Sequence, residues 1–346
     1  MKKFVQLKKL SPGDQVAVIS PSSGLAGVFT WVQDLGIERL NDIFKLSAKE
    51  YPTTRMVGAS LEQRAQDIMQ AFADPNNKAV IATIGGEDQI KLLKYLNPDV
   101  LKANPKPFFG YSDNTHLHNY LWNLGIPSYY GGSVLTQYGM QGKMYEETVN
   151  SLKRAFFEQG TYDLKPNSIF NDQGLDWSDK KALTEFRNTE ENEGYYWDGT
   201  NSGTGVLWGG CVESLIAQMA AGIYLPANTD LKGTVLIIET SESIPEPWVV
   251  EYLLTGFGER GWFDNFCGVL VGRPKAWEFD KQLTPEAKLA YRKKQRSVVV
   301  DVVRQYNATI PIVQNLDFGH TDPQIVMPLG QVVYIDPVKQ TISATY

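Results

Sequence analysis

Residues 107–115 read Pro-Phe-Phe-Gly-Tyr-Ser-Asp-Asn-Thr and combine an apolar run with a sharp turn. The run predicts a short buried strand that stops at Gly110, followed by a helix from about Thr115 to Leu124. A serine at such a turn has the geometry of a nucleophile elbow, and the backbone N–H groups that follow would stabilise developing negative charge. The same residues also suit a simpler role, in which Ser112 or Asp113 only caps the helix.

The neighbouring segments alternate between strand and helix patterns. Residues 15–20 (QVAVIS) and 79–84 (AVIATI) are nearly continuous apolar runs, and residues 61–73 have apolar side chains at helical spacing. This alternation predicts an α/β fold with a parallel sheet covered by helices. Ligands of such sheets bind at the carboxyl ends of the strands. Three turns are expected at that edge: Ser20, Gly85-Gly86 and Ser112.

The chain divides into three parts by texture. Residues 1–160 form the N-terminal α/β domain, residues 161–202 a linker and substrate-binding loop, and residues 203–346 a mixed α/β C-terminal domain. The middle part is rich in turn residues and acidic residues, yet it carries Trp177 and Trp197. Aromatic side chains in a polar loop suit a binding lid, although they could equally pack back onto their own domain.

Bulk composition excludes several classes of function. The 346 residues are 42% hydrophobic, with a formal net charge of −6 and no basic stripe, so nucleic acid is not expected as a partner. No apolar stretch approaches the roughly 20 residues that span a bilayer, and residues 1–9 lack the apolar core of a signal peptide. Cys211 and Cys267 have no metal-ligand spacing and are too few for a disulfide scaffold. Free thiols of this kind suit a reducing compartment, so a cytoplasmic location is expected.

A serine nucleophile needs a base, and the chain offers only three histidines. His320 is the strongest candidate, because it lies in a turn-like stretch containing Gly and Pro where catalytic groups are common. His116, four residues after Ser112, could face the same side of the helix and stays an alternative. His118 is a weaker alternative on the same helix.

The base in turn needs an orienting carboxylate. Glu239 ends an apolar strand over residues 234–239 and is the first choice, with the more exposed Glu242 and Glu246 as competitors. The order Ser, acid, His matches α/β-hydrolases, but Asn114 stands where their elbow has glycine, which counts against an esterase of that class. Donors to an oxyanion are expected from the backbone of Asp113 and of the Gly85-Gly86 turn, unless that turn is an ordinary strand-to-helix connection.

Taken together, these motifs resemble the LD-carboxypeptidase family of serine peptidases over nearly the whole chain. The blocks that carry the resemblance are residues 83–88 (TIGGED), residues 104–115 (NPKPFFGYSDNT), Gly209-Gly210, Ile238-Glu239 and Gly319-His320. The resemblance implies a Rossmann-like N-terminal domain and a C-terminal domain with a small β-barrel-like sheet, often in a homodimer. It implies neither a metal ion nor an organic cofactor.

The resemblance also assigns roles. It implies Ser112 as nucleophile, His320 as general base and acid, and Glu239 as the residue that orients His320. The backbone N–H groups of Gly86 and Asp113 would form the oxyanion hole. The interval between Glu239 and His320 is longer than is usual in the family, which puts the loop around His320 in doubt.

Two branches of the family differ in substrate. One removes the terminal D-alanine from a peptidoglycan tetrapeptide, and the microcin C immunity branch cleaves the amide between a C-terminal aspartate and a nucleotide. Ile84 before Gly85-Gly86, together with the aromatic excursion, favours the second branch and a small peptidyl- or aminoacyl-nucleotide as substrate. Gly85, Trp177 and Trp197 are then candidate substrate contacts, with Trp177 the first choice to stack on the base. A muropeptide carboxypeptidase and a noncatalytic nucleotide-peptide binding protein are the alternatives.

Overall fold

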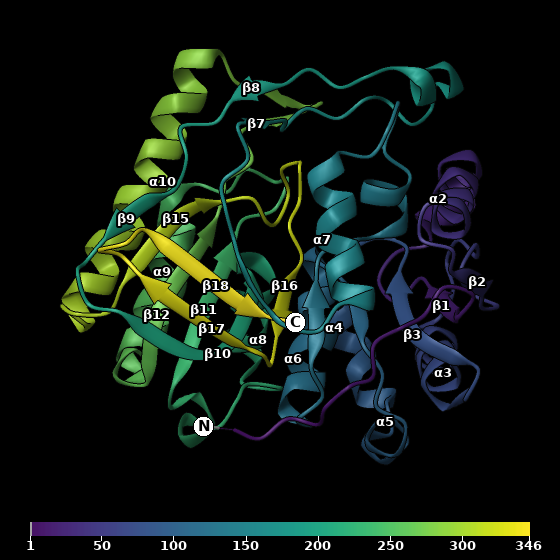
Figure 1. Ribbon diagram of the computed structural model, residues 1–346, viewed down its shortest axis with the longest axis horizontal. Coiled ribbons are helices and arrows are strands. Elements are labelled where there is room, and N and C mark those ends of the chain that lie inside the picture. Colours follow the sequence, from purple (N-terminus) through teal and green to yellow (C-terminus); the bar gives the residue numbers. More distant parts are fainter. Residues whose placement is uncertain (1) are drawn as a thin grey trace.

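The computed structural model describes residues 2–346, apart from the side chain of Lys181, and contains two main sheets (Figure 1). The first sheet has the strand order β16-β5-β4-β3-β1-β2, and all neighbouring pairs are parallel except β16 with β5. Its strands are β1 (Gln15–Ile19), β2 (Ser47–Glu50), β3 (Asn77–Ala82), β4 (Phe108–Gly110), β5 (Ser128–Tyr130) and β16 (Met327–Leu329). The helices of this half are α1 (Leu25–Val28), α2 (Thr30–Asp42), α3 (Leu61–Ala73), α4 (Gln89–Leu92), α5 (Pro98–Ala103), α6 (Thr115–Asn123) and α7 (Glu146–Phe157).

Local sequence accounts for these elements. The central strands β1, β3 and β4 are buried on both faces, which is why their sequences are nearly continuous apolar runs. Helix α3 begins at a capping box: Ser60 Oγ accepts from the Gln63 N–H at 3.2 Å, and Gln63 Oε1 accepts from the Ser60 N–H at 3.0 Å. Its buried face carries Ile68 and Phe72 at helical spacing.

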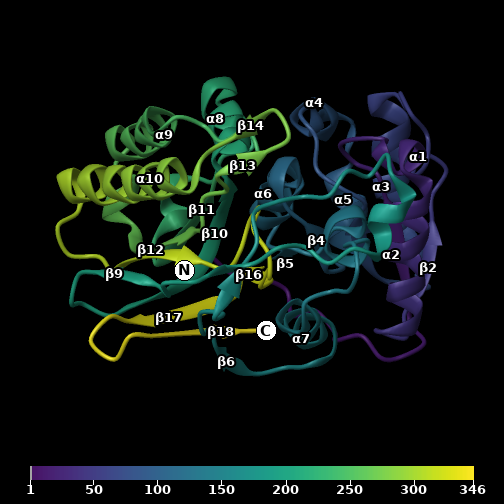
Figure 2. The same ribbon diagram turned by 90° about the horizontal axis from the view of Figure 1, so that it is seen from above.

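The second sheet has the order β6-β18-β17-β10-β11-β12-β15-β9, with β10, β11, β12 and β15 parallel and the outer strands antiparallel. Its strands are β6 (Thr161–Asp163), β9 (Tyr196–Asp198), β10 (Gly203–Cys211), β11 (Thr234–Glu239), β12 (Phe266–Gly272), β15 (Ile312–Leu316), β17 (Val332–Asp336) and β18 (Thr341–Thr345). Helices α8 (Val212–Ala221), α9 (Pro247–Glu259) and α10 (Pro285–Tyr306) lie on one face of this sheet (Figure 2). Two ribbons complete the chain: β7 (Ile169–Phe170) with β8 (Glu190–Glu191), and β13 (Trp277–Glu278) with β14 (Lys281–Gln282).

The predicted fold class is confirmed: a parallel N-terminal sheet is followed by a mixed α/β region. Where the resemblance implies a small barrel-like sheet, the structure has the eight-stranded mixed sheet. Residues 161–202, expected as a linker and loop, also supply β6 and β9 to the two edges of that sheet. No helix within residues 2–346 combines the length and apolarity needed to cross a bilayer.

The two sheets share one hydrophobic core, and the C-terminal part of the chain adds one strand, β16, to the first sheet. Phe109 of β4 and Ile237 of β11 belong to the same buried cluster. After β15 in the second sheet the chain crosses over and forms β16 at the edge of the first sheet. This crossing segment, residues 317–326, carries His320. The fold therefore places His320 between the carboxyl ends of both sets of parallel strands.

Gln324 fastens this crossing segment. Its buried side chain donates to the Gly319 carbonyl at 2.6 Å and accepts from the Gly132 N–H at 2.8 Å. Gln324→Ala leaves both groups without these partners, and we expect the free energy of unfolding to fall by about 2 kcal/mol or more. Gln282→Ala, at an exposed position, should change it by less than about 0.5 kcal/mol. Urea denaturation measures both, and equal midpoints would contradict the role of Gln324.

Candidate active site

Ser112 has a strained backbone at the turn that follows β4. Its φ of +64° lies in the left-handed region, which costs a non-glycine residue about 1–3 kcal/mol and marks functional sites. Residues 112–114 form a 3-10 turn that leads directly into α6. His118 on α6 bonds the Gly110 carbonyl through Nε2 at 2.8 Å and so holds the strand end in place. The strand-to-helix turn predicted from the sequence is present, and the surrounding contacts fix it.

Asn114 explains why the elbow departs from the glycine pattern of α/β-hydrolases. Its buried side chain donates to the carbonyls of Tyr111 (3.0 Å) and Ile84 (3.2 Å). Its Oδ1 accepts from Gln89 Nε2 at 2.9 Å. The Asn114 side chain thus links the elbow to the turn after β3 through hydrogen bonds, and a glycine at this position would lack all three of them.

The Gly85-Gly86 turn lies directly against Ser112. A Cβ atom on Gly85 would come within 2.8 Å of Ser112 Cβ, 3.0 Å of Ser112 Oγ and 3.4 Å of the Asp113 nitrogen. Only glycine allows backbone to approach this closely. The Asp113 side chain turns away to accept from the Gln89 N–H at 3.0 Å. The structure therefore brings Gly85 and the Asp113 backbone to the serine, whereas Gly86 lies against Ser22 and lines the same cavity.

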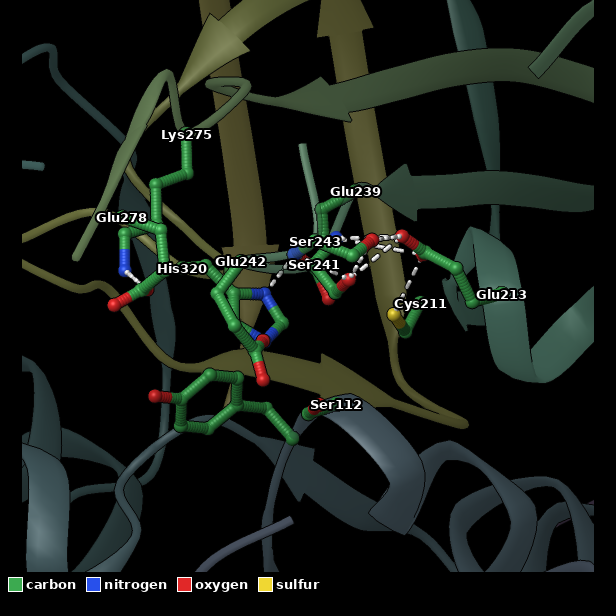
Figure 3. A network of polar contacts seen from close by, with 12 residues as sticks. Ser112, Cys211, Glu213, Glu239, Ser241, Glu242, Ser243, Lys275, Glu278 and His320 are labelled. Atoms are coloured by element: carbon green, nitrogen blue, oxygen red, sulfur yellow. Dashed lines mark hydrogen bonds and ion pairs between the residues drawn. The ribbon is translucent and has the colours of Figure 1, made fainter. Parts of the chain in front are cut away.

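Glu239 and His320 form a buried pair beside the elbow (Figure 3). Glu239 ends β11, its side chain is fully buried, and its Oε2 lies 2.6 Å from His320 Nδ1. Gly319 has a φ of +95°, and a Cβ there would come within 2.5 Å of Glu239 Oε2. Glycine before His320 is thus required both by the backbone conformation and by the close approach of the carboxylate.

Tyr130 is a site residue that the sequence reasoning missed. Its hydroxyl donates to Glu239 Oε1 at 2.5 Å and accepts from the Ser112 N–H at 3.1 Å, so it bridges the elbow and the buried acid. Burial and the neighbouring Glu239 charge hold the pKa of Tyr130 far above its usual value, so it stays a neutral donor. Its place at the carboxyl end of β5 points to the site only once β5 is known to lie beside β4.

The two histidines of α6 have other environments. His118 contacts Ser128 Oγ at 2.7 Å as well as the Gly110 carbonyl, and His116 Nε2 lies 3.4 Å from Asp113 Oδ1. Both are buried, and burial lowers the pKa of His116 to about 4 and that of His118 to about 3. Of the three histidines, His320 is the one that lines the same cavity as Ser112.

The second nitrogen of His320 faces Glu242. Glu242 Oε2 lies 3.0 Å from His320 Nε2, and among the hydrogen bonds of the described residues none joins His320 to Ser112. Burial by itself lowers the pKa of His320, but the charges and hydrogen bonds of Glu239 and Glu242 outweigh it and raise the pKa to about 10. Glu246, the third acid considered, lies at the start of α9 and is exposed.

A cavity of about 810 Å³ opens over these residues. Ser112, Gly85, Gly86, His320 and Trp177 all line it. Trp177 packs against Phe29 with ring centroids 5.4 Å apart, and its carbonyl accepts from Trp31 Nε1 at 2.8 Å.

Trp197 lies elsewhere. It belongs to the edge strand β9, packs against the core shared by the sheets, and does not line the cavity. Within the part of the chain that the structure describes, no three His, Cys, Asp or Glu side chains converge as metal ligands would.

Comparisons with known proteins agree with this geometry. The chain matches the LD-carboxypeptidase N-terminal domain over residues 16–131 and the LD-carboxypeptidase C-terminal domain over residues 204–335. The chain belongs to the LD-carboxypeptidase family. A putative carboxypeptidase of Treponema pallidum is 29% identical over 98% of this chain and 95% of its own length. The microcin C7 self-immunity protein MccF of Escherichia coli is 25% identical over 83% of this chain and 79% of its own length.

The same relationship is seen among solved structures. An MccF-like protein from Streptococcus pneumoniae, in complex with AMP, superposes with a TM-score of 0.84 at 28% identity, covering 96% of this chain and 99% of its own. The predicted family is therefore confirmed.

Histidine-selective NMR checks the electrostatics of the site. His116 and His118 should stay neutral down to about pH 4 and pH 3, because burial disfavours their charged forms. His320 should stay doubly protonated until about pH 10, because two carboxylates face its ring. A His320 titration near its ordinary pKa of 6.5 would contradict the pairing.

Proposed function

We propose that this chain is a serine hydrolase that cleaves the amide between an acidic aminoacyl group and a nucleotide. The observation that carries the proposal is one juxtaposition: a strained Ser112, the Gly85-Gly86 turn and His320 line the same cavity, and the buried Glu239 holds the His320 ring from behind. A nucleophile on a sharp turn, an oriented histidine and close backbone donors are the parts that acyl transfer requires.

In the first half of the reaction Ser112 Oγ attacks the substrate carbonyl while neutral His320 takes the hydroxyl proton on Nε2. Glu239 holds the ring through Nδ1 and stabilises the imidazolium that forms. The N–H groups of Gly86 and Asp113 donate to the oxyanion. His320 then gives its proton to the leaving nitrogen, the C–N bond breaks, and an acyl-serine ester remains.

In the second half a water molecule replaces the leaving amine. His320 takes a proton from the water, which attacks the ester carbonyl, and the oxyanion is held by the same two N–H groups. Collapse of this intermediate returns the proton to Ser112 Oγ and releases the acid. Tyr130 stays neutral throughout and holds Glu239 and the elbow in fixed positions relative to each other through its two hydrogen bonds.

The nucleotide part of the substrate is supported by the cavity wall and by two relatives. The indole of Trp177 lines the cavity that holds Ser112, and stacking on a base contributes about 1–3 kcal/mol. The Streptococcus pneumoniae relative binds AMP, and MccF is an immunity protein against microcin C7. Arg187 and Lys275 line the same wall, each paired with a carboxylate, Asp322 at 2.9 Å and Glu278 at 2.6 Å, and an acidic aminoacyl group could compete for these cations.

Turnover of aspartyl sulfamoyl adenosine, an aspartyl-nucleotide analogue in which a sulfamoyl group replaces the phosphate, tests the reaction. Wild type should release aspartate, and Ser112→Ala should lose about 10⁴-fold or more in rate because the nucleophile is gone. Mass spectrometry follows both. Release of D-alanine from a murein tetrapeptide, with no turnover of the adenosine compound, would instead assign the chain to peptidoglycan recycling.

Trp177 has a separate test. Trp177→Ala should weaken AMP binding by about 1–3 kcal/mol, or roughly 5- to 150-fold in Kd, through lost stacking. Trp248→Ala is the matched control, because Trp248 is an exposed tryptophan on α9 that does not line the cavity. Isothermal calorimetry measures both variants, and an unchanged Kd in Trp177→Ala would remove Trp177 from the nucleotide site.

A further inference from the structure

We propose that Glu242 is a positioning residue that occupies His320 Nε2 in the resting site and must leave it before Ser112 can be activated. The inference rests on the proposed function, in which this same nitrogen accepts the Ser112 proton. Glu242 Oε2 lies 3.0 Å from Nε2, whereas Glu239 Oε2 lies 2.6 Å from Nδ1. In Figure 3 the two carboxylates reach the ring from opposite sides, with Ser112 on the side of Glu242.

The two acids differ in their freedom to move. The Glu239 side chain is fully buried and held by Tyr130, whereas the Glu242 side chain is 55% exposed and lines the cavity. The Glu242 side chain is held in place by its contact with His320. Glu239 thus suits a permanent partner of the ring, and Glu242 suits a partner that can be exchanged.

The loop that carries Glu242 is itself anchored. Glu213 on α8 accepts hydrogen bonds from the hydroxyls of Ser241 (2.7 Å) and Ser243 (3.0 Å), the residues on either side of Glu242. It also accepts from the Ser241 N–H at 3.2 Å. Because the backbone is held on both sides, Glu242 can leave His320 by rotating its own side chain into the cavity, without a rearrangement of the loop.

The charged groups around His320 make the presence of Glu242 decide whether the ring keeps its Nε2 proton. The titratable or charged groups that face the ring or its two carboxylate partners are Glu239, Glu242, Tyr111, Tyr130, Cys211, Lys275 and Asp322. Burial raises the pKa of Tyr111 and Cys211, so both are neutral near pH 7. Lys275 is paired with Glu278 at 2.6 Å on the cavity wall. The two carboxylates therefore keep both ring nitrogens of His320 protonated. In that state His320 cannot act as the base for Ser112.

Release of Glu242 has a definite consequence for catalysis. With Glu242 bound, Nε2 carries a proton and points it at a carboxylate, so it cannot accept the Ser112 proton. When Glu242 turns away, the imidazolium keeps one acidic partner, gives its proton to solvent more readily, and presents a lone pair toward Ser112. A ligand that draws Glu242 into the cavity thereby couples its own binding to the activation of His320.

The test compares Glu242→Gln and Glu242→Ala with wild type. Glu246→Gln is the matched control, because it removes the same charge from an exposed position outside the cavity. Histidine-selective NMR without substrate should show the His320 midpoint falling by at least one pH unit in Glu242→Gln and further in Glu242→Ala. The control should leave it unchanged. An unmoved midpoint in both Glu242 variants, or an equal shift in Glu246→Gln, would overturn the inference.

Kinetics with aspartyl sulfamoyl adenosine test the consequence. The acidic limb of kcat/KM against pH reports the free enzyme, so it should move to lower pH with the NMR midpoint, and kcat/KM at pH 7 should rise about tenfold for each unit. A shifted midpoint with an unmoved limb would overturn the coupling to catalysis. Failure of the proposed function looks different, since wild type and every variant would then show no turnover while the NMR result still decides the role of Glu242.

Discussion

The site depends on one buried carboxylate. Glu239 sits at the carboxyl end of β11 with both oxygens engaged, one by His320 and the other by Tyr130. An ionised carboxylate without such partners would be costly to bury, and removing one partner of a buried pair typically costs about 3–5 kcal/mol. Because His320 comes from the crossing segment and Tyr130 from the first sheet, the same interaction that orients the histidine also ties the two halves together.

Chain topology makes this meeting possible. The parallel strands of both sheets end near the cavity, so Ser112 after β4 and Glu239 at the end of β11 come close enough for Tyr130 to bridge them, although they are far apart in sequence. The β15-to-β16 crossing then delivers His320 between them. The strained φ of Ser112 is maintained by neighbours that are themselves fixed, notably Asn114 and His118. The strain at Ser112 is therefore supported by ordinary packing elsewhere.

The sequence predicts a large part of this arrangement, because some of the candidate site residues stand at recognisable points in a local sequence pattern. A serine after a buried strand and a carboxylate closing an apolar run both stand out without a structure, and the α/β class follows from the same alternation. Tyr130 could not be found this way, because its role depends on β5 lying beside β4. The strand exchange by β16 also leaves no local trace. From the sequence, Glu242 is only a rival of Glu239, because the loop conformation that Glu213 sets decides which nitrogen of His320 it faces.

We infer that the buried Glu239–His320 pair makes Ser112 nucleophilic. Labelling with a fluorophosphonate, followed by tandem mass spectrometry, tests it directly in wild type and in Glu239→Gln, which keeps the shape of the side chain and removes its charge. We expect a single adduct on Ser112 and a labelling rate at least about 10²-fold lower in the variant. An adduct on another residue, or equal rates in the two proteins, would contradict it.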